Sequence, residues 1–175
     1  MDHPSFLEGR KEALLEAWFA RALEAYPADT ARFLKAERDP FANPVGAAFR
    51  KGLPVLLDFL SGVADREAAQ EALGEIVRIR AVQETVPSRG LGFLLPVRPL
   101  IGEQARGLDD AGRRTLEGRV DELVMLAFDL WSSDRDRMAD IKVREMKRRM
   151  YMVERASGLL DEKAGPEGGE EPSGG

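Results

Sequence analysis

Residues 75–86, EIVRIRAVQETV, carry the pattern that decides the fold class, and they also interrupt it. On a helical wheel of 100° per residue, Ile76 and Val77 fall on one side with other apolar residues, as a helix facing a core requires. Arg80 falls in the middle of that apolar side, and Gln83 lies at its edge. The stretch therefore predicts an amphipathic helix that directs a guanidinium group toward the core.

Helical spacing of apolar residues extends along almost the whole chain. No segment alternates apolar and polar residues with the period of a strand. The sequence predicts helices over residues 5–26, 29–36, 44–63, 65–85, 109–131 and 134–160. Pro96 and Pro99 interrupt the apolar residues 86–107, which are expected to form two short helical pieces. The predicted fold class is all-α, with about seven or eight helices and a long C-terminal helix.

The stretch DPFANPVG, residues 39–46, predicts two turns between helices. Residues that precede proline avoid the helical conformation, so Asp39 and Asn43 are expected to be extended and to cap the helical turns that begin after them. Pro44 then stands at the first position of the next helix, where its missing N–H costs nothing. Phe41, between the two turns, is expected to point inward as an anchor.

Two further sites are expected to disturb helices. Gly52 and Pro54 predict a kink or a break within residues 44–63, because proline lacks the N–H that an interior helical position needs. Ser132 and Ser133 are expected to bend or end the helix that precedes them.

The predicted domain organisation has three parts. A chain of 175 residues, of which 43% are hydrophobic and 33% charged, suits one globular domain of ordinary size. We expect this domain over residues 1–133, followed by a C-terminal helix over residues 134–163. Residues 164–175 are rich in glycine, proline and glutamate and are expected to form a disordered tail.

The sequence lacks the residues on which most catalytic sites depend. There is no cysteine, which excludes disulfides, thiolate metal sites and a cysteine nucleophile. The single histidine, His3, lies at the N-terminus. The carboxylates show neither metal-ligand spacing nor Glu-x-x-His pairs. We therefore predict no enzyme activity, no metal and no cofactor.

Charge and hydropathy indicate which cellular location and which classes of partner are expected. The net charge of −5 argues against general nucleic-acid binding. No run of about 18 apolar residues is present, so no membrane insertion is expected. The N-terminus has no signal-peptide pattern, which predicts a cytoplasmic location.

Two motifs, DPFANPVG at residues 39–46 and IVRIRAVQ at residues 76–83, resemble the RsbRD N-terminal domain family. This is the N-terminal domain of RsbR-type RsbT co-antagonists of the bacterial stressosome. Trp18 and the later GFLLP run occur in the expected order, so the resemblance covers roughly residues 5–130. It implies a globin-like helical fold that binds no haem, and a sensory or regulatory role in signal transduction and stress response, often as a dimer. We expect a stand-alone form without the STAS domain that follows in full-length members.

The absence of haem is also expected from the residues themselves. A haem globin needs an axial ligand, normally a histidine inside the fold, and the only histidine is His3. Attachment of a linear tetrapyrrole through cysteine is excluded as well. The central space of a globin-like fold is therefore expected to be filled by side chains or to hold another ligand.

Two interpretations of Arg80 follow from its position. In the first, its stem packs on the core while its head reaches water or pairs with Glu84 four residues later. In the second, Arg80 and Gln83 face inward and hold a polar network. Arg80 would then clamp a carboxylate, either that of Asp39 in the turn that also contains Asn43, or that of an acidic ligand. We favour the Asp39 carboxylate over an acidic ligand, because one contact between Arg80 and the DPFANPVG turn would explain both motifs.

The last predicted helix, within residues 134–160, carries a candidate partner or dimer face. Its apolar positions follow the 3-4-3-4-3 spacing of a coiled-coil seam and comprise Val143, Met146, Met150, Val153, Ser157 and Leu160. Methionines suit an adaptable binding surface. The alternative is a core helix with a solvated basic face, because lysine and arginine are concentrated between residues 142 and 149.

These observations favour a haem-free, globin-like regulatory module that acts by contact with another protein or with a second copy of itself. One alternative is a structural accessory subunit of a redox or membrane-bound complex, for example sulfite-reduction machinery. Another is a carrier of a small apolar or carboxylate ligand, anchored by Arg80.

Overall fold

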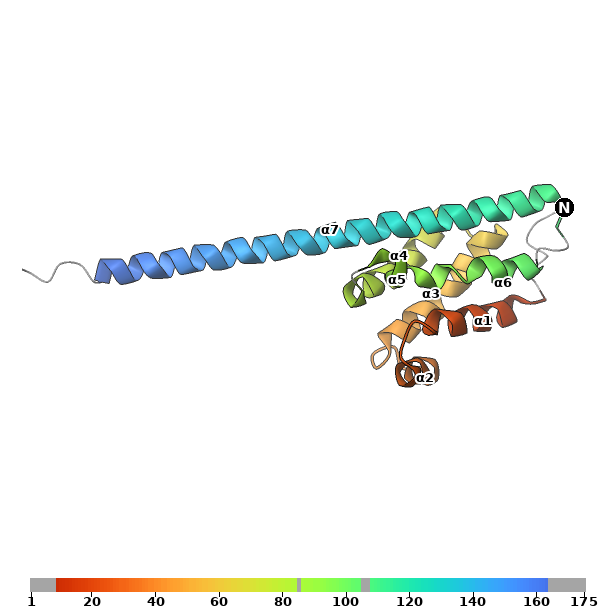
Figure 1. The fold of residues 1–175 in the computed structure, drawn as a ribbon, viewed down its shortest axis with the longest axis horizontal. Helices are drawn as coiled ribbons and strands as arrows, with labels where there is room; N and C mark the ends of the chain where they lie inside the picture. Colours follow the sequence, from red (N-terminus) through yellow and green to blue (C-terminus); the bar gives the residue numbers. More distant parts are fainter. Residues whose placement is uncertain (1–8, 85, 105–107, 164–175) are drawn as a thin grey trace, which may run out of the picture. The chain divides into compact units, whose positions relative to one another are not determined.

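The structure is a computed structural model in which the described residues are 9–84, 86–104 and 108–163, without the side chains of 103, 104 and 157–163. Within these ranges the chain is helical apart from turns and short connections, and none of these residues forms a strand (Figure 1). The predicted all-α class with a long C-terminal helix is therefore confirmed.

The chain divides into two compact units, Met1–Asp134 and Arg135–Gly175. The elements follow in the order α1 (Lys11–Leu23), α2 (Ala28–Ala36), α3 (Pro44–Ser61), α4 (Arg66–Gln83), α5 (Pro87–Gly90), the 3₁₀ helix η2 (Gly92–Leu94), α6 (Val97–Gln104) and α7 (Asp110–Lys163). His3 and the tail predicted over residues 164–175 lie outside the described residues.

Helices α3 and α4 pack against each other in the first unit (Figure 1). Gly52 permits their close approach, because a Cβ at this position would lie 2.7 Å from Cδ1 of Ile76 on α4. Helix α3 ends at Ser61 and is capped by Gly62, whose φ of +84° lies in the left-handed region that glycine adopts without strain. Asp65 then caps α4 by accepting a hydrogen bond from the backbone N–H of Ala68.

The core of the first unit is formed by buried apolar side chains of α1, α3, α4, η2, α6 and the first part of α7, and one part of it lies where α1 packs against α3, η2 and α6. Trp18 is buried in α1, and its indole Nε1 donates a hydrogen bond of 2.7 Å to the carbonyl of Phe93. The rings of Phe93 and Phe49 meet edge to face with centroids 5.3 Å apart. Aromatic packing of this kind fixes η2 against the first and third helices.

Two acidic or amide side chains cap helices where the sequence predicts helix starts. The Oδ1 atom of Asn43 accepts a hydrogen bond of 2.8 Å from Gly46 N, and Pro44 occupies the first position of α3, as predicted. Asp109 likewise accepts from Gly112 N at 2.8 Å, immediately before α7 begins. These caps satisfy backbone donors that a helix start leaves without partners.

Two predicted interruptions do not break their helices. Pro54 lies inside α3, which continues to Ser61, so the predicted break is wrong. The proline removes one backbone hydrogen bond, whereas the neighbouring turns bury a continuous apolar face that includes Leu56. Ser132 and Ser133 lie inside α7, where a serine costs only about 0.5 kcal/mol relative to alanine, so the predicted end of the helix there is also wrong.

Residues between the main helices also differ from expectation. The segment after α4 forms three short helical pieces and not two. Phe41, predicted to point inward, is 95% exposed. The turn around it is held by Asp39, whose side-chain carboxylate accepts from Phe41 N and whose backbone carbonyl accepts from Asn43 N. Val63, the last residue of the helix predicted over residues 44–63, follows α3 and is exposed.

Candidate functional site

Arg80 occupies the last turn of α4 and is buried, with 3% of its surface exposed. A buried guanidinium carries five N–H groups that need partners, and leaving its charge unpaired would cost several kcal/mol. The surroundings of Arg80 therefore determine whether it serves the fold or awaits a ligand.

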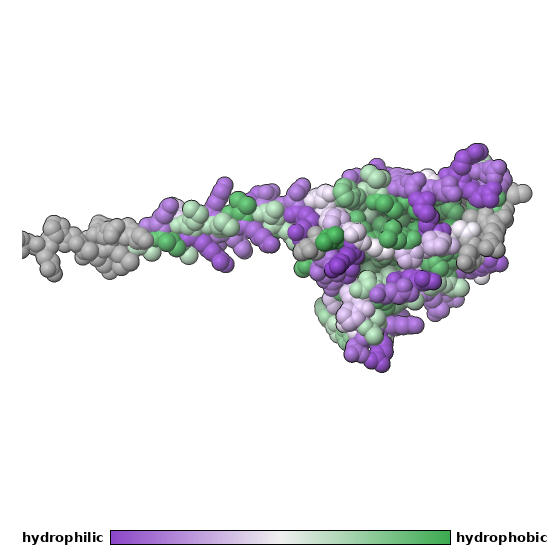
Figure 2. Space-filling model, in the orientation of Figure 1, coloured by the Kyte–Doolittle hydropathy of each residue, from purple (hydrophilic) through white to green (hydrophobic). Residues whose placement is uncertain are grey.

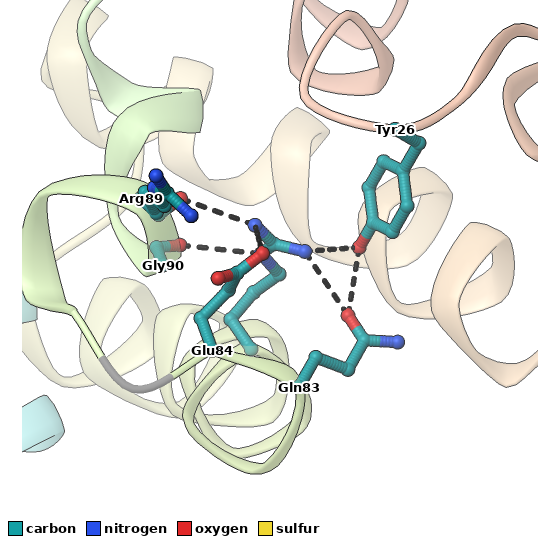
Figure 3. A network of polar contacts seen from close by, with 6 residues as sticks. Tyr26, Gln83, Glu84, Arg89 and Gly90 are labelled. Carbon is teal, nitrogen blue, oxygen red and sulfur yellow. Dashed lines mark hydrogen bonds and ion pairs between the residues drawn. The ribbon is translucent and has the colours of Figure 1, made fainter.

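Four hydrogen bonds surround the guanidinium of Arg80 (Figure 3). Nη1 donates to Tyr26 Oη at 2.6 Å and to Gln83 Oε1 at 3.0 Å. Nη2 donates to the carbonyl of Arg89 at 3.1 Å, and Nε donates to that of Gly90 at 3.3 Å. A carboxylate oxygen of Glu84 lies 3.7 Å from Nη2. The chain itself thus supplies partners on every side of this cation.

Tyr26 closes the network from the connection between α1 and α2. Its hydroxyl donates to Gln83 Oε1 at 2.9 Å, and the Arg80 Cζ atom lies 4.8 Å from its ring centroid, over the ring face. Burial raises the pKa of the Tyr26 hydroxyl, while the nearby Arg80 charge lowers it by a smaller amount. The network therefore joins the end of α1, the end of α4 and the short helix α5.

The predicted partners Gln83 and Glu84 both contact Arg80, whereas Tyr26 and the α5 carbonyls were not predicted. Arg80 lies inward, whereas Gln83, predicted to face inward with it, is exposed. The predicted clamp from Arg80 to Asp39 is wrong, because the Arg80 donors are directed to Tyr26, to Gln83 and to backbone carbonyls of α5. Asp39 is exposed, and its carboxylate holds the turn by accepting from Phe41 N. An acidic ligand at Arg80 would have to displace bonds that the fold already makes.

Asn43 serves a second buried junction. Its side-chain Nδ2 donates hydrogen bonds of 2.9 Å to the carbonyls of Leu34 and Glu37, while its Oδ1 caps α3. Gly46 has room for no side chain here, because a Cβ would lie 2.3 Å from the Asn43 amide nitrogen. Asn43 therefore ties the end of α2 to the start of α3, and its contacts are structural.

The second unit presents the predicted partner face. Every residue from 139 to 156 is exposed. The four described seam residues are 48% to 65% exposed and comprise Val143, Met146, Met150 and Val153. Figure 2 shows apolar and charged side chains interleaved along this helix. Leu160 belongs to α7, but its side chain lies outside the described residues.

An apolar groove of about 480 Å³ in the first unit was not predicted from the sequence. It lies between the α5–η2 segment and α7. Leu95 on its rim is 71% exposed, and Val86 and Phe128 are also exposed. The consecutive pair Leu94 and Leu95 was the available signal, since two adjacent leucines in a short helical turn cannot both face inward.

The described ranges contain neither a cluster of metal-ligand side chains nor a long apolar helix. They contain no group of three or more His, Cys, Asp or Glu side chains arranged to hold a metal ion. No helix there combines the length and the apolar character needed to cross a bilayer. Comparisons with protein-family models, with curated proteins and with solved structures found no match for this chain.

Proposed function

We propose that this chain is a non-enzymatic regulatory module that acts through protein–protein contact and associates with a second copy of itself through α7. The observation that carries the proposal is the seam of Val143, Met146, Met150 and Val153, whose side chains are all substantially exposed on one face of the helix. Apolar side chains at this spacing are buried when two helices pair.

The exposed helix itself supports a partner. Residues 139–156 contribute nothing to a core of the chain, since all of them are exposed. Helices in water draw most of their stability from the packing of an apolar face, so a seam without cover lacks that contribution. Pairing with a second seam would supply it. Methionines at two of the four positions would adapt to an imperfect partner surface.

The regulatory part of the proposal rests on the resemblance to the RsbRD N-terminal domain family, with its haem-free, globin-like fold, its role in stress signalling and its cytoplasmic setting. The satisfied network around Arg80 supports a structural role for the arginine–glutamine motif. It does not favour the carrier anchored at Arg80. An absorbance spectrum of the purified protein checks the haem-free assignment, and a Soret band would contradict it.

Self-association is tested by light scattering on the full chain over a range of concentrations. We expect the mass of a dimer at high concentration and that of a monomer after dilution. The double variant Met146→Gln and Met150→Gln should remain monomeric, because it places polar amides in the seam. Both methionines are exposed and do not support the core, so the variant should still fold.

The matched control for this experiment changes the opposite face of the same helix. Arg144 and Arg148 lie on that face at helical spacing and are exposed. Arg144→Gln with Arg148→Gln should leave the dimer in place. A monomer at every concentration, or a dimer that survives the methionine substitutions, would overturn the proposed interface.

A further inference from the structure

A pocket of about 360 Å³ opens in the first unit between α1, the end of α2 and α3. Its floor is apolar, because Phe49 and Leu53 are buried there. Leu15, Phe19 and Pro54 form partly exposed walls. A volume of this size lies within the range of sites for small organic molecules, which are commonly apolar with a few placed polar groups.

Three cations border this apolar pocket: Lys35, Arg38 and Arg50. Within the described part of the chain, no carboxylate forms an ion pair with any of them. Glu16 is the acidic residue of the lining, and it is exposed. The pocket therefore combines a hydrocarbon surface with positive charge that is not matched by direct ion pairs.

Arg50 is held in place before any ligand arrives. Its Nη2 donates to the carbonyls of Leu34 at 2.7 Å and Lys35 at 2.9 Å, and its Cζ lies 5.1 Å from the Phe19 ring centroid. These contacts fix the side chain and leave Nε and Nη1 without a hydrogen bond to the described residues. A donor that is already ordered loses less entropy when a ligand binds.

The electrostatics of the pocket agree with this geometry. Partial burial lowers the pKa of the Arg50 guanidinium, and the charge of Arg38 lowers it further, while Glu37 acts in the opposite direction. The positive charge is thus incompletely compensated by the protein. An anion placed between Arg50 and Arg38 would relieve that repulsion.

We propose that this pocket binds a small carboxylate with an apolar body, its carboxylate at Arg50 and the neighbouring cations and its hydrocarbon part against Phe49 and Leu53. Guanidinium groups pair well with carboxylates, and the apolar floor adds the burial that a simple inorganic anion would not use. The site lies entirely within the first unit. It does not depend on the proposed self-association of the terminal helix.

Titration of the full chain with octanoate, followed by amide chemical shifts, tests the site. We expect saturable changes confined to α1, the α2–α3 connection and α3. Octanamide has the same chain without the charge and should bind at least tenfold more weakly. Equal affinity for the acid and the amide would overturn the proposal, as would an absence of saturable shifts.

Variants separate the two parts of the pocket. Lys35→Gln with Arg38→Gln changes exposed side chains, so folding should be retained, and affinity for octanoate should fall at least tenfold. Leu15→Trp should fill the apolar cavity and abolish binding of both compounds. Arg32→Gln removes an exposed cation of α2 that does not line the pocket and should leave the affinity unchanged. Binding that is insensitive both to Lys35→Gln with Arg38→Gln and to Leu15→Trp would place the ligand elsewhere.

Discussion

Arg80 acts as a junction at the scale of single residues. One side chain fixes the hydroxyl of Tyr26 and two carbonyls of α5, so a single substitution would remove a hydrogen bond from all three groups at once. Arg80→Met keeps the apolar stem but removes the partners of these groups. Breaking such a buried charged network should lower the free energy of unfolding by about 3–5 kcal/mol, measured by urea denaturation with circular dichroism.

A control on the same helix sharpens this test. Val82 lies two residues away and is exposed, so Val82→Ala should change the free energy of unfolding by less than about 0.5 kcal/mol. Arg80→Lys keeps the charge but not the planar fork, and should recover only a small part of the loss. A destabilisation by Arg80→Met no larger than that of the valine control would show that the network contributes little.

Tyr26 makes the same network sensitive to alkaline pH. Because burial raises its pKa above the usual value of 10.0, the folded state binds the phenolic proton more tightly than the unfolded state does. Its contribution to stability is therefore complete below pH 10 and is lost as pH rises through the folded pKa. The stability difference between the wild type and Tyr26→Phe should shrink between about pH 8 and about pH 11. A constant difference in urea denaturation would contradict this.

The inward position of Arg80 could be predicted from the sequence, because the helical period of residues 75–86 determines which side faces the core. Its partners could not. Tyr26 stands 54 positions earlier in the chain, and the two carbonyls belong to backbone that no side-chain pattern marks. The same limit explains the wrong prediction for Asp39, which was chosen because it was a nearby carboxylate in a distinctive motif. Phe41 had no periodic neighbours to determine its direction.

At the scale of elements, the contact between α5 and α7 depends on Gly90. A Cβ at this position would lie 1.9 Å from the Trp131 ring, which is buried within the first unit. Gly90→Ala must therefore displace the indole or the short helix, and it should lower the free energy of unfolding by about 1–3 kcal/mol, as overpacking does elsewhere.

Gly92 provides the matched control for that contact. Nothing lies within 4 Å of a Cβ built there, so Gly92→Ala should be neutral or slightly stabilising. Thermal unfolding of the two variants side by side distinguishes a steric effect from a general loss of glycine flexibility. Equal destabilisation by both substitutions would exclude the steric explanation.

Helix starts were easier to predict than helix interruptions. Asn43 and Asp65 mark the starts of α3 and α4. A short polar side chain before a helical pattern has a specific partner, because it accepts a hydrogen bond from the backbone N–H two or three residues later. Pro54 and Ser132 indicate only a local loss of helix stability, and the sequence does not show how much of that loss is offset by packing. Helix α3 therefore continues through Pro54, and α7 continues through Ser132.

At the scale of the whole molecule, charge should govern self-association. Between residues 139 and 156 the helix carries six basic and three acidic side chains, so two copies repel each other. Salt screens exposed charges over a Debye length of about 10 Å at 0.1 M. The dimer should therefore tighten several-fold between about 50 mM and about 300 mM salt, as measured by analytical ultracentrifugation. Association that weakens with salt would indicate attraction to an acidic surface.

The sequence indicated which face of the terminal helix carries an apolar seam, but not which partner would cover it. A seam is recognised from the spacing of apolar residues in one chain, and here that spacing is shown by Val143, Met146, Met150 and Val153. A partner is a second surface, which the sequence of one chain does not contain. The apolar groove near Leu95 and the cationic pocket near Arg50 escaped prediction because each joins side chains from separate helices.

Trp18 and Trp131 are the two tryptophans of the chain, and both are buried in the first unit. Their fluorescence emission will report the melting of that unit alone and will be silent to fraying of residues 135–163. Far-ultraviolet ellipticity sums over both units. If the terminal helix melts independently, the two optical signals will trace separate transitions from a single sample, with no added label.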